Sequence, residues 1–427
     1  MNEDFLQFVW KNKLFNTQKL VTTNGEQIEI LKPGFQNFDA GPDFIDARIK
    51  INDTLWAGNV EIHLKSSDWN SHYHSNDKAY NNVILHVVHK HDEEVITNAN
   101  RKLPTFVMDF DNKLFANYNQ LLFSASDIRC ADKLEIINEF KLKHWFERVL
   151  VNRLEKKSRI FLQQLKSEKY SWEEAFYIQI ARNFGFKTNA LPFEMLTRAT
   201  PLHILAKHKN SLFQIEALLF GQAGFLKNDA GDDYFLKLRK EYLFLQHKYQ
   251  LKPIEEHLWK FLRLRPANFP TVRLTQFAYL IFTSHGLFSK IIEANNIEQL
   301  IALFDVNTSE YWEKHYKFNE ESKKRIKRLG QHSVKNILIN TVVPVLFVYG
   351  EEKDNENYKE RAFHILESLP AERNHIVEKW RELKLEIKNA LDSQACIELY
   401  NEFCKPQKCL HCDIGREVIL KYEEGNL

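Results

Sequence analysis

The most informative stretch of the sequence is residues 41–69, GPDFIDARIKINDTLWAGNVEIHLKSSDW. Apolar residues take the odd positions of residues 44–51 and, after a turn at Asn52-Asp53-Thr54, the even positions of residues 60–65. Successive side chains of a strand point to opposite faces, so the pattern predicts two strands with one buried face each. The turn between them predicts an antiparallel hairpin.

The polar face of this hairpin carries acidic and basic groups that could act together. Antiparallel pairing brings Asp46 near Glu61 and puts His63 and Lys65 in the same row. Two converging carboxylates suit Mg²⁺ or Mn²⁺, and a base beside them can orient a water for metal-assisted hydrolysis. The plain alternative is an amphipathic hairpin whose polar face is simply solvated.

Two parts of the stretch resemble the PD-(D/E)XK nuclease-like superfamily, whose core is an acidic residue, a hairpin and then Asp/Glu-X-Lys. Pro42-Asp43 matches the first part and Glu61-Ile62-His63 the second, with histidine at the usual lysine position. The resemblance implies that His63, or Lys65 two residues along, activates the water. It favours Asp43 as the first metal ligand, whereas strand parity favours Asp46 unless a bulge after Phe44 rotates the chain.

The loop after the hairpin, residues 68–77 (DWNSHYHSND), is rich in potential ligands. His72 and His74 point the same way on an extended chain and could contact a phosphate or support the metal ligands from a second shell. Together with His63, Asp68 and His86 they also define a rival histidine-rich metal site. Taken alone, His86 lies in an apolar run, 83–89 (VILHVVH), and is expected in the core.

The composition is that of a soluble globular protein with two or three domains. Of its 427 residues, 44% are hydrophobic and 27% charged, and 59 Lys+Arg nearly balance 57 Asp+Glu, so any nucleic-acid-binding groove must be local. The acidic start, MNEDFLQFVW, is unlike a signal peptide. The apolar run 333–349 is interrupted by Pro344, which favours a buried helix over a membrane span. We expect a cytoplasmic protein, and the sequence does not indicate its oligomeric state.

The chain is predicted to be α+β, with strand patterns confined to its first third. Residues 1–128 are expected to form a mixed β-sheet domain with a nuclease-like α/β core. Helical periodicity then dominates and predicts an all-α domain, 129–395, of eight to ten helices. The helical stretches are 134–165, 172–184, 201–220, 232–249, 253–264, 274–293 and 298–304.

One part of the helical domain is locally basic. Arg263, Arg265 and Arg273 lie around two prolines in RLRPANFPTVRL, residues 263–274. A rigid basic turn of this kind can bind phosphates. The alternative is that these arginines cap helices or pair with acids.

A cysteine-rich tail, residues 396–427, closes the chain. It holds Cys396-X7-Cys404-X4-Cys409-X2-Cys412, that is, four of the five cysteines. A C-X2-C pair fixes two thiolates on one metal, and four thiolates suit zinc or a [4Fe–4S] cluster. Without Cys396, His411 or an outside ligand would complete the shell, and the plain alternative is a set of buried thiols.

Along its length the sequence resembles the bacterial family known as domain of unknown function 2851. The resemblance is carried by GPDF (41–44), GNVEIHLKSSDW (58–69), RLRPANFP (263–270), INTVVPVLFVYG (339–350) and CLHCDIG (409–415). The family brings no established activity. Three hypotheses therefore follow from the candidate sites: a metal-dependent nuclease or phosphodiesterase acting on DNA or RNA, a non-catalytic nucleic-acid-binding or scaffold protein with a degenerate nuclease core, and a histidine-rich metalloenzyme acting on a small molecule.

Overall fold

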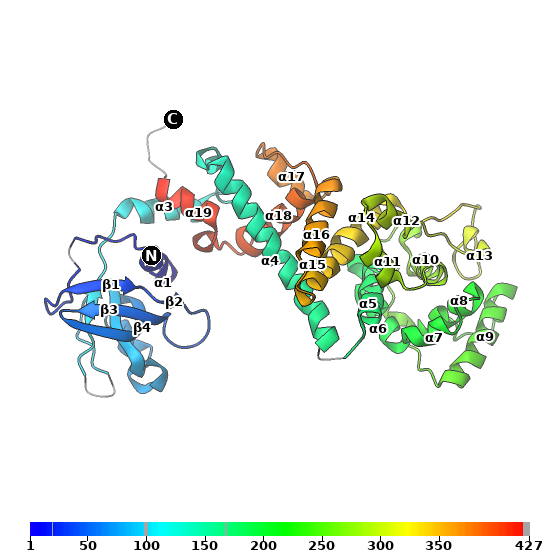
Figure 1. Ribbon diagram of the computed structural model, residues 1–427, viewed down its shortest axis with the longest axis horizontal. Helices are drawn as coiled ribbons and strands as arrows, with labels where there is room; N and C mark the ends of the chain where they lie inside the picture. Colours follow the sequence, from blue (N-terminus) through cyan, green and yellow to red (C-terminus); the bar gives the residue numbers. More distant parts are fainter. Residues whose placement is uncertain (19, 98–100, 167–168, 422–427) are drawn as a thin grey trace. The chain divides into compact units, whose positions relative to one another are not determined.

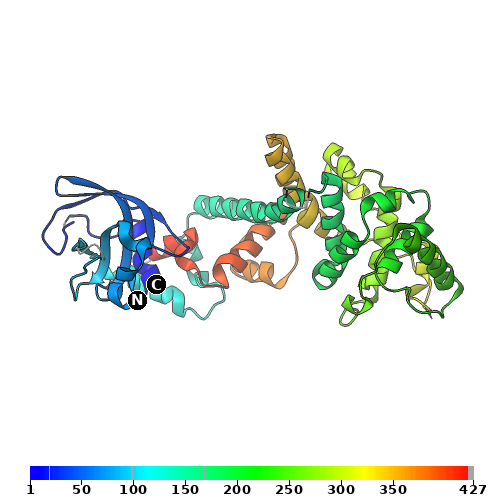
Figure 2. The ribbon, with the colours of Figure 1, turned by 90° about the horizontal axis from the view of Figure 1, so that it is seen from below.

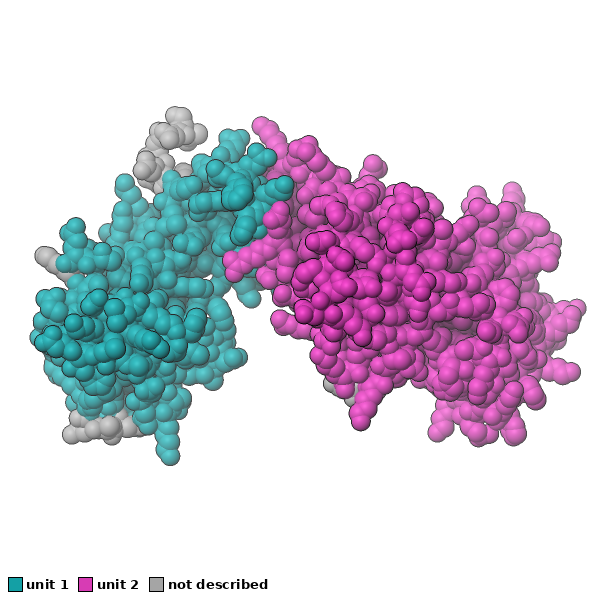
Figure 3. Space-filling model, in the orientation of Figure 1, with its two compact units in different colours: residues 1–145, 399–427 teal, residues 146–398 magenta. Residues whose placement is uncertain are grey.

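The structure is a computed structural model that describes residues 1–18, 20–97, 101–166 and 169–421. It contains two compact units (Figure 3): unit 1 comprises residues 1–145 and 399–427, and unit 2 comprises residues 146–398. Most of the predicted tail, 396–427, belongs to unit 1, which includes residues 399–427. Its last helix packs on the N-terminal domain, where Asn117 Nδ2 donates to the carbonyl of Ile419 (2.9 Å).

Unit 1 is built around a mixed sheet with the strand order β1-β3-β4-β5-β6, and β2 pairs with β3. The pairs β4–β5 and β5–β6 are parallel, and the others are antiparallel. The fold class is therefore α+β, as predicted. The strands are β1 (Ile28–Lys32), β2 (Phe35–Gln36), β3 (Phe44–Ile51), β4 (Thr54–Lys65), β5 (Val83–Lys90) and β6 (Thr105–Val107).

The predicted hairpin is present as β3 and β4, with a bulge that the register reveals. Phe44 pairs with Val60 and Ala47 with Gly58, so two residues of β3 oppose one residue of β4. The second of them, Asp46, has a φ of 54°. A bulge shifts the side-chain alternation by one position. The alternation of residues 47–51 therefore does not continue through residues 44–46.

The parallel neighbour of β4 explains the apolar run of residues 83–88. All six of these residues of β5 are buried, as expected for a strand covered on both faces. A parallel connection needs a crossover. Here it is made by short helical turns: α2 (Asp68–Ser71), η1 (His74–Asn76) and η2 (Lys78–Asn82).

Helix α1 (Glu3–Lys11) covers the sheet with an apolar face that includes Phe5, Phe8 and Trp10. Its N-terminus is capped by the side chain of Asn2, which accepts a hydrogen bond from the amide of Phe5. In two views, the last helix lies beside α3 (Figure 1, Figure 2), and α1 contacts η8, the short turn before it. The remaining elements of unit 1 are α3 (Asn112–Phe123), η3 (Ala131–Ile136), the π-turn η7 (Tyr400–Cys404), η8 (Cys409–His411) and α19 (Asp413–Lys421).

Unit 2 is helical, as predicted, apart from a two-stranded ribbon, β7 (His315–Lys317) and β8 (Glu320–Glu321). The long helix α4 (Glu139–Lys166) begins in unit 1 and continues into unit 2. The other helices of unit 2 are α5 (Trp172–Phe184), α6 (Phe186–Ala199), α7 (Leu202–Ala206), α8 (Leu212–Gln222), α9 (Asp233–Tyr249), η4 (Glu256–Leu258), η5 (Pro266–Asn268), α10 (Pro270–Thr283), α11 (Leu287–Glu293), α12 (Ile297–Ala302), α13 (Glu310–Glu313), α14 (Gln331–Ile337), η6 (Leu338–Val342), α15 (Val343–Glu352), α16 (Glu356–Ser368), α17 (His375–Glu382) and α18 (Ala390–Leu399).

The helix predicted over residues 253–264 is wrong, because most of this segment has no regular structure apart from η4. Tertiary contacts override its periodicity. The amide of Ile254 donates to the carbonyl of Gln222 (2.8 Å), and the indole of Trp259 donates to the carbonyl of Ala223 (2.8 Å). The apolar residues thus tie an irregular segment to the end of α8.

One helical run, Gln331–Glu352, is long and apolar enough to span a membrane, but 78% of its most apolar window is buried inside the protein. This agrees with the predicted core helix. The π-turn η6 lies directly before Pro344, where a proline ring would otherwise clash with the carbonyl four residues earlier.

Candidate metal centre

The two carboxylates of the predicted motif meet between the start of β3 and the middle of β4. The amide of Asp43 donates a hydrogen bond to Glu61 Oε2 (3.0 Å), and the amide of Ile62 donates one to Asp43 Oδ2 (3.0 Å). Each carboxylate is therefore held by the backbone of the opposite strand. Glu61 is only 5% exposed, so this end of the pair is inside the unit and not on a solvated face.

Helix α1 fixes the other oxygen of Asp43. Gln7 Nε2 donates to Asp43 Oδ1 (2.8 Å), and Gln36 Nε2 donates in turn to Gln7 Oε1 (3.1 Å). Gln7 could not be predicted from the sequence, because a single glutamine on an amphipathic helix has no recognisable spacing to the motif. Its amide holds the Asp43 oxygen that the amide of Ile62 does not contact.

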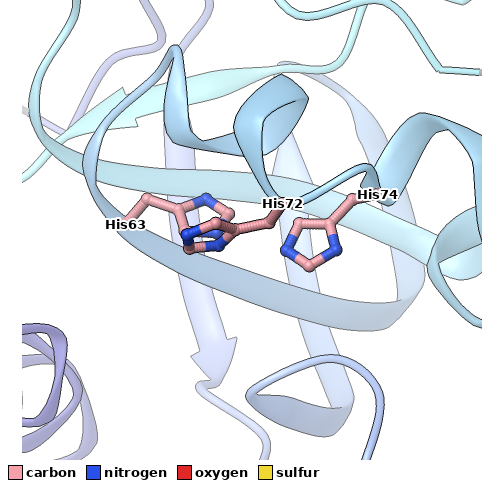
Figure 4. A group of neighbouring side chains, drawn as sticks. All are labelled: His63, His72 and His74. Atoms are coloured by element: carbon pink, nitrogen blue, oxygen red, sulfur yellow. The ribbon is translucent and has the colours of Figure 1, made fainter.

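Three imidazoles, those of His63, His72 and His74, lie close together (Figure 4). His63 comes from β4, and His72 and His74 come from the turns that follow α2. One ring nitrogen from each lies within 4.8 Å of the others, which is close enough for one metal ion. His63 is buried, His74 is half-buried and His72 is exposed, so the group leads from the interior to the surface.

Glu61 joins the histidines to the carboxylate pair. Its Oε1 lies 3.5 Å from His63 Nε2 and 3.3 Å from His74 Nε2. Neither of these buried nitrogens has a hydrogen-bond partner. Buried polar atoms nearly always have a hydrogen-bond partner. Two unpaired nitrogens that face one carboxylate oxygen are therefore suitable ligands for a cation.

His86 on β5 supports His63 from behind. His63 Nδ1 and His86 Nε2 are 2.8 Å apart, a hydrogen bond whose direction depends on the tautomers. If His63 donates through Nδ1, its Nε2 carries a lone pair directed at the site, as metal-binding histidines commonly do. His86 is fully buried, as the sequence predicted, but it also has this contact with the site.

Burial determines the charge state of the group. It raises the pKa of Asp43 to about 7, helped by the nearby charge of Glu61, and it raises the pKa of Glu61 to about 8. It lowers the pKa of His63 to about 2 and that of His86 to about 3, with neighbouring imidazoles adding to the effect. Near neutral pH Glu61 therefore largely keeps its proton and Asp43 keeps it in part, and a cation would displace these protons, whereas the imidazoles of His63 and His86 are neutral.

Two aromatic side chains hold the histidine-bearing loop in place. The ring of Tyr80 stacks on His74 with centroids 3.8 Å apart, and the indole of Trp69 meets His74 edge-on at 5.4 Å. Trp69 Nε1 also donates to Ser75 Oγ (3.0 Å). His74 is therefore wedged between rings and pre-positioned toward Glu61.

Other predicted site residues of unit 1 lie outside this group. Asp46 is exposed and pairs with Lys32, because the bulge in β3 turns its side chain away. Lys65 is exposed on the last residue of β4, and its charge helps to lower the pKa of Asp92. Asp68 accepts a hydrogen bond from the amide of Lys65 (2.8 Å), which fits a turn-forming role.

The three predicted phosphate-binding arginines belong to unit 2. Arg263 and Arg265 are exposed. Arg273 is buried and donates to Gln276 Oε1 (3.0 Å), Ser333 Oγ (3.0 Å) and the side chain of Asn268. The contacts of Arg273 are those of a residue that ties helix α10 to its neighbours.

The predicted cysteine cluster is divided between the two units. Cys404, Cys409 and Cys412 belong to unit 1. Cys396 belongs to unit 2, where it is fully buried on α18 and its carbonyl accepts a hydrogen bond from the indole of Trp380 (3.1 Å).

Comparison with protein-family models matches residues 3–375 to a family described as "Protein of unknown function (DUF2851)". The chain belongs to the DUF2851 family. No curated protein and no solved structure matches the chain. The family match includes the whole carboxylate–histidine group and ends before the terminal cysteines. Because none of these comparisons supplies an activity, any function proposed for this DUF2851 protein rests on its sequence and on the geometry of its site.

Proposed function

We propose that unit 1 is a metal-dependent hydrolase of phosphodiester bonds that acts on DNA or RNA. The observation that supports it most is the reciprocal hydrogen bonding of Asp43 and Glu61 beside three convergent imidazoles. This arrangement combines two carboxylates with neutral nitrogen donors in a partly buried site, which is the environment that metal-assisted hydrolysis needs.

The donor set indicates which metal fits. Carboxylate oxygens suit Mg²⁺ and Mn²⁺, whereas imidazole nitrogens suit zinc, iron and other transition metals. Glu61, His63, His72 and His74 offer both kinds of donor. Mn²⁺ and Zn²⁺ therefore fit better than Mg²⁺, although Mg²⁺ remains compatible with the carboxylates alone. A bound ion would lower the pKa of a water and polarise the phosphate.

We assign the residues as follows. His63 and His74 would bind the metal through Nε2, with Glu61 Oε1 between them. Asp43, held by Gln7 and the amide of Ile62, would orient the water or provide a further carboxylate oxygen. His72, which is exposed, would contact the phosphate and pass a proton to solvent.

This assignment makes His63 a metal ligand, whereas the sequence resemblance suggested that it activates the water. With a pKa near 2, its imidazole cannot carry a proton at neutral pH, which disfavours it as the base that activates water. A neutral imidazole is instead a good metal ligand. The choice of phosphodiester substrates rests on the sequence resemblance alone, that is, on the Glu61-X-His63 spacing on β4 and on Asp43 directly before β3.

Cleavage assays with matched carboxylate variants test the proposal. Purified full-length protein is incubated with single- and double-stranded DNA and RNA in the presence of Mn²⁺, Zn²⁺ or Mg²⁺. We expect metal-dependent cleavage that falls by at least about 100-fold in Glu61→Gln, as loss of a charged site group typically produces, and is unchanged in Asp46→Asn. An unchanged rate in Glu61→Gln would overturn the proposal.

The three-histidine group favours one alternative, a metalloenzyme acting on a small molecule. The same protein should then hydrolyse a small phosphodiester such as bis(p-nitrophenyl) phosphate while leaving polynucleotides intact. A scaffold protein with a degenerate core would bind nucleic acid and cleave neither substrate. The substrate panel therefore separates all three hypotheses.

A further inference from the structure

Two loop segments of unit 2 carry exposed basic side chains. The first, residues 262–268, lies between η4 and α10 and includes Arg263 and Arg265. The second, residues 322–330, joins β8 to α14 without regular structure and contains the run KKRIKR, residues 323–328. Every residue of this run except Lys327 is exposed. The two segments are far apart in the sequence, so they share a surface only if the fold brings them together.

Strand β7 makes this connection. The Nζ of Lys317 lies 5.8 Å and 5.9 Å from the ring centroids of Phe261 and Phe269, which flank the first segment. In the second segment, the Nζ of Lys327 lies 4.2 Å from the ring centroid of Tyr316, the residue next to Lys317 on β7. Both segments therefore border β7, and their exposed cations belong to one surface.

Five cations of these segments have no partner charge. Three neighbouring lysines form ion pairs: Lys324 with Glu313 (3.2 Å), Lys314 with Glu321 (3.5 Å) and Lys317 with Glu320 (3.5 Å). Among the residues that the structure describes, no ion pair includes the other exposed cations, which are Arg263, Arg265, Lys323, Arg325 and Arg328. These five side chains, which we call the basic surface, thus offer their charges to an anionic partner.

We propose that the basic surface binds the phosphate backbone of a nucleic acid. Four of its five cations are arginines, whose planar guanidinium groups donate paired hydrogen bonds to phosphate oxygens. The choice of a nucleic acid among polyanions rests on the hydrolase function proposed for unit 1. Binding itself needs no metal ion, so the two proposals can fail separately.

Lys327 anchors the second segment. It is buried, and its Nζ donates to the carbonyl of Glu313 (2.8 Å) and to that of Trp312. Its own carbonyl accepts a hydrogen bond from Gln276 Nε2 (2.9 Å). One lysine of the run thus faces inward and holds the backbone, while its basic neighbours stay in solvent. A backbone that is already ordered loses less conformational entropy when a partner binds.

The first segment is held in two consecutive turns. The amide of Leu264 donates to the carbonyl of Phe261 (3.2 Å), and the amide of Asn268 donates to that of Arg265 (2.8 Å). Arg263, inside the first turn, has a φ of 62°. This conformation is uncommon for a residue with a side chain, and such residues cluster at functional sites.

Two exposed aliphatic side chains lie among these cations, Leu262 (83% exposed) and Ile326 (62% exposed). An anionic membrane also combines negative charge with apolar contact, but membrane anchoring uses a broad apolar face. Here each aliphatic residue stands singly beside basic neighbours. Single apolar side chains of this kind suit contact with nucleic-acid bases or insertion between them, so a nucleic acid fits this surface better than a membrane does.

Binding assays with charge-removing variants test the proposal. Fluorescence anisotropy is measured for labelled single-stranded DNA, double-stranded DNA and single-stranded RNA with full-length protein, in EDTA and at several salt concentrations. The logarithm of the affinity should fall linearly with the logarithm of the salt concentration. Arg263→Gln/Arg265→Gln and Arg325→Gln/Arg328→Gln should each weaken binding about 10-fold or more in ~0.1 M salt and lower this slope by about 1.5, because each lost phosphate contact contributes about 0.7–0.9.

Two controls separate this inference from the hydrolase proposal. Lys237→Gln/Lys240→Gln removes the same charge from exposed lysines of α9 in the same unit and should leave both affinity and slope nearly unchanged. Glu61→Gln should bind as tightly as wild type in EDTA. Protein that binds with the expected salt slope but cleaves nothing would refute the hydrolase proposal and support the basic surface.

Hydrogen–deuterium exchange on wild-type protein covers the case in which an arginine variant fails to fold. The amides of residues 262–268 and 322–330 should exchange more slowly when an oligonucleotide is bound. Unchanged exchange in both segments of a complex, or arginine variants that bind as tightly as the α9 control, would overturn the proposal. So would wild-type protein that binds vesicles of phosphatidylserine and phosphatidylcholine but none of the three nucleic acids.

Discussion

Asp43 and Glu61 each accept a hydrogen bond from the backbone of the other's strand, the donors being the amides of Ile62 and Asp43, both at 3.0 Å. The bulge in β3 makes this exchange possible because it lets the strand begin in a register that brings Asp43 opposite β4. The backbone amides of the two strands thus fix the positions of both carboxyl groups.

Loss of His86 should weaken metal binding without removing a ligand. His86→Ala leaves His63 Nδ1 without its partner, and loss of such supporting contacts typically costs about 10- to 100-fold in metal affinity. His89→Ala, an exposed histidine on the same strand, is the matched control. Titration calorimetry with Mn²⁺ or Zn²⁺ would check this. Equal affinities of the His86 and His89 variants would contradict a supporting role.

Metal affinity should rise between pH 6 and 8 because of the carboxyl groups. The pKa values near 7 for Asp43 and 8 for Glu61 mean that binding displaces protons from them, whereas His63, with a pKa near 2, has none to lose. Calorimetry at pH 6.5 in two buffers of different ionisation enthalpy should show about one to two protons released per ion. A flat affinity over this range would show that the carboxylates are already charged.

The metal-free protein should lose stability as pH rises, and Glu61→Gln should remove part of that loss. The folded pKa of Glu61, about 8, lies above its ordinary value of 4.5. The contribution of Glu61 to the free energy of unfolding is therefore fully present below pH 4.5. It decreases by at most about 1.4 kcal/mol per pH unit as the pH approaches 8. In chelator, the stability of Glu61→Gln relative to wild type should grow from pH 5 to 8 in urea unfolding. A constant difference would contradict the raised pKa.

The pairing of β4 with β5 depends on a close contact at Gly58. An added Cβ atom would lie 2.5 Å from both the carbonyl oxygen of Asn82 and a methyl group of Ile84. Gly58→Ala should therefore destabilise unit 1 by about 1–3 kcal/mol, the usual range for overpacking. Ala57→Ser, at an exposed neighbouring position, should leave the urea midpoint unchanged. Equal urea midpoints for the two variants would contradict the close contact between β4 and β5 at Gly58.

Local sequence patterns were enough to predict the hairpin and the buried strand β5, because the first depends on side-chain alternation and the second on a continuous apolar run. Asp43 came only from the resemblance to the nuclease superfamily, and strand parity favoured Asp46. Local patterns could not decide between Asp43 and Asp46. That choice depends on the bulge, where Asp46 adopts a positive φ, and side-chain alternation in the sequence does not reveal this backbone conformation.

Local sequence patterns could not predict contacts between residues that lie far apart in the chain. Gln7 reaches Asp43 from a helix near the N-terminus. Asn117 likewise donates a hydrogen bond to the carbonyl of Ile419, about 300 residues further along the chain.

The most direct test of the central claim is pulsed electron paramagnetic resonance of the full-length protein titrated with Mn²⁺. The account predicts one tightly bound ion per chain with nitrogen couplings from histidine, lost in both His63→Ala and Glu61→Gln and retained in Asp46→Asn. Binding without nitrogen couplings, or unchanged binding in Glu61→Gln, would contradict it.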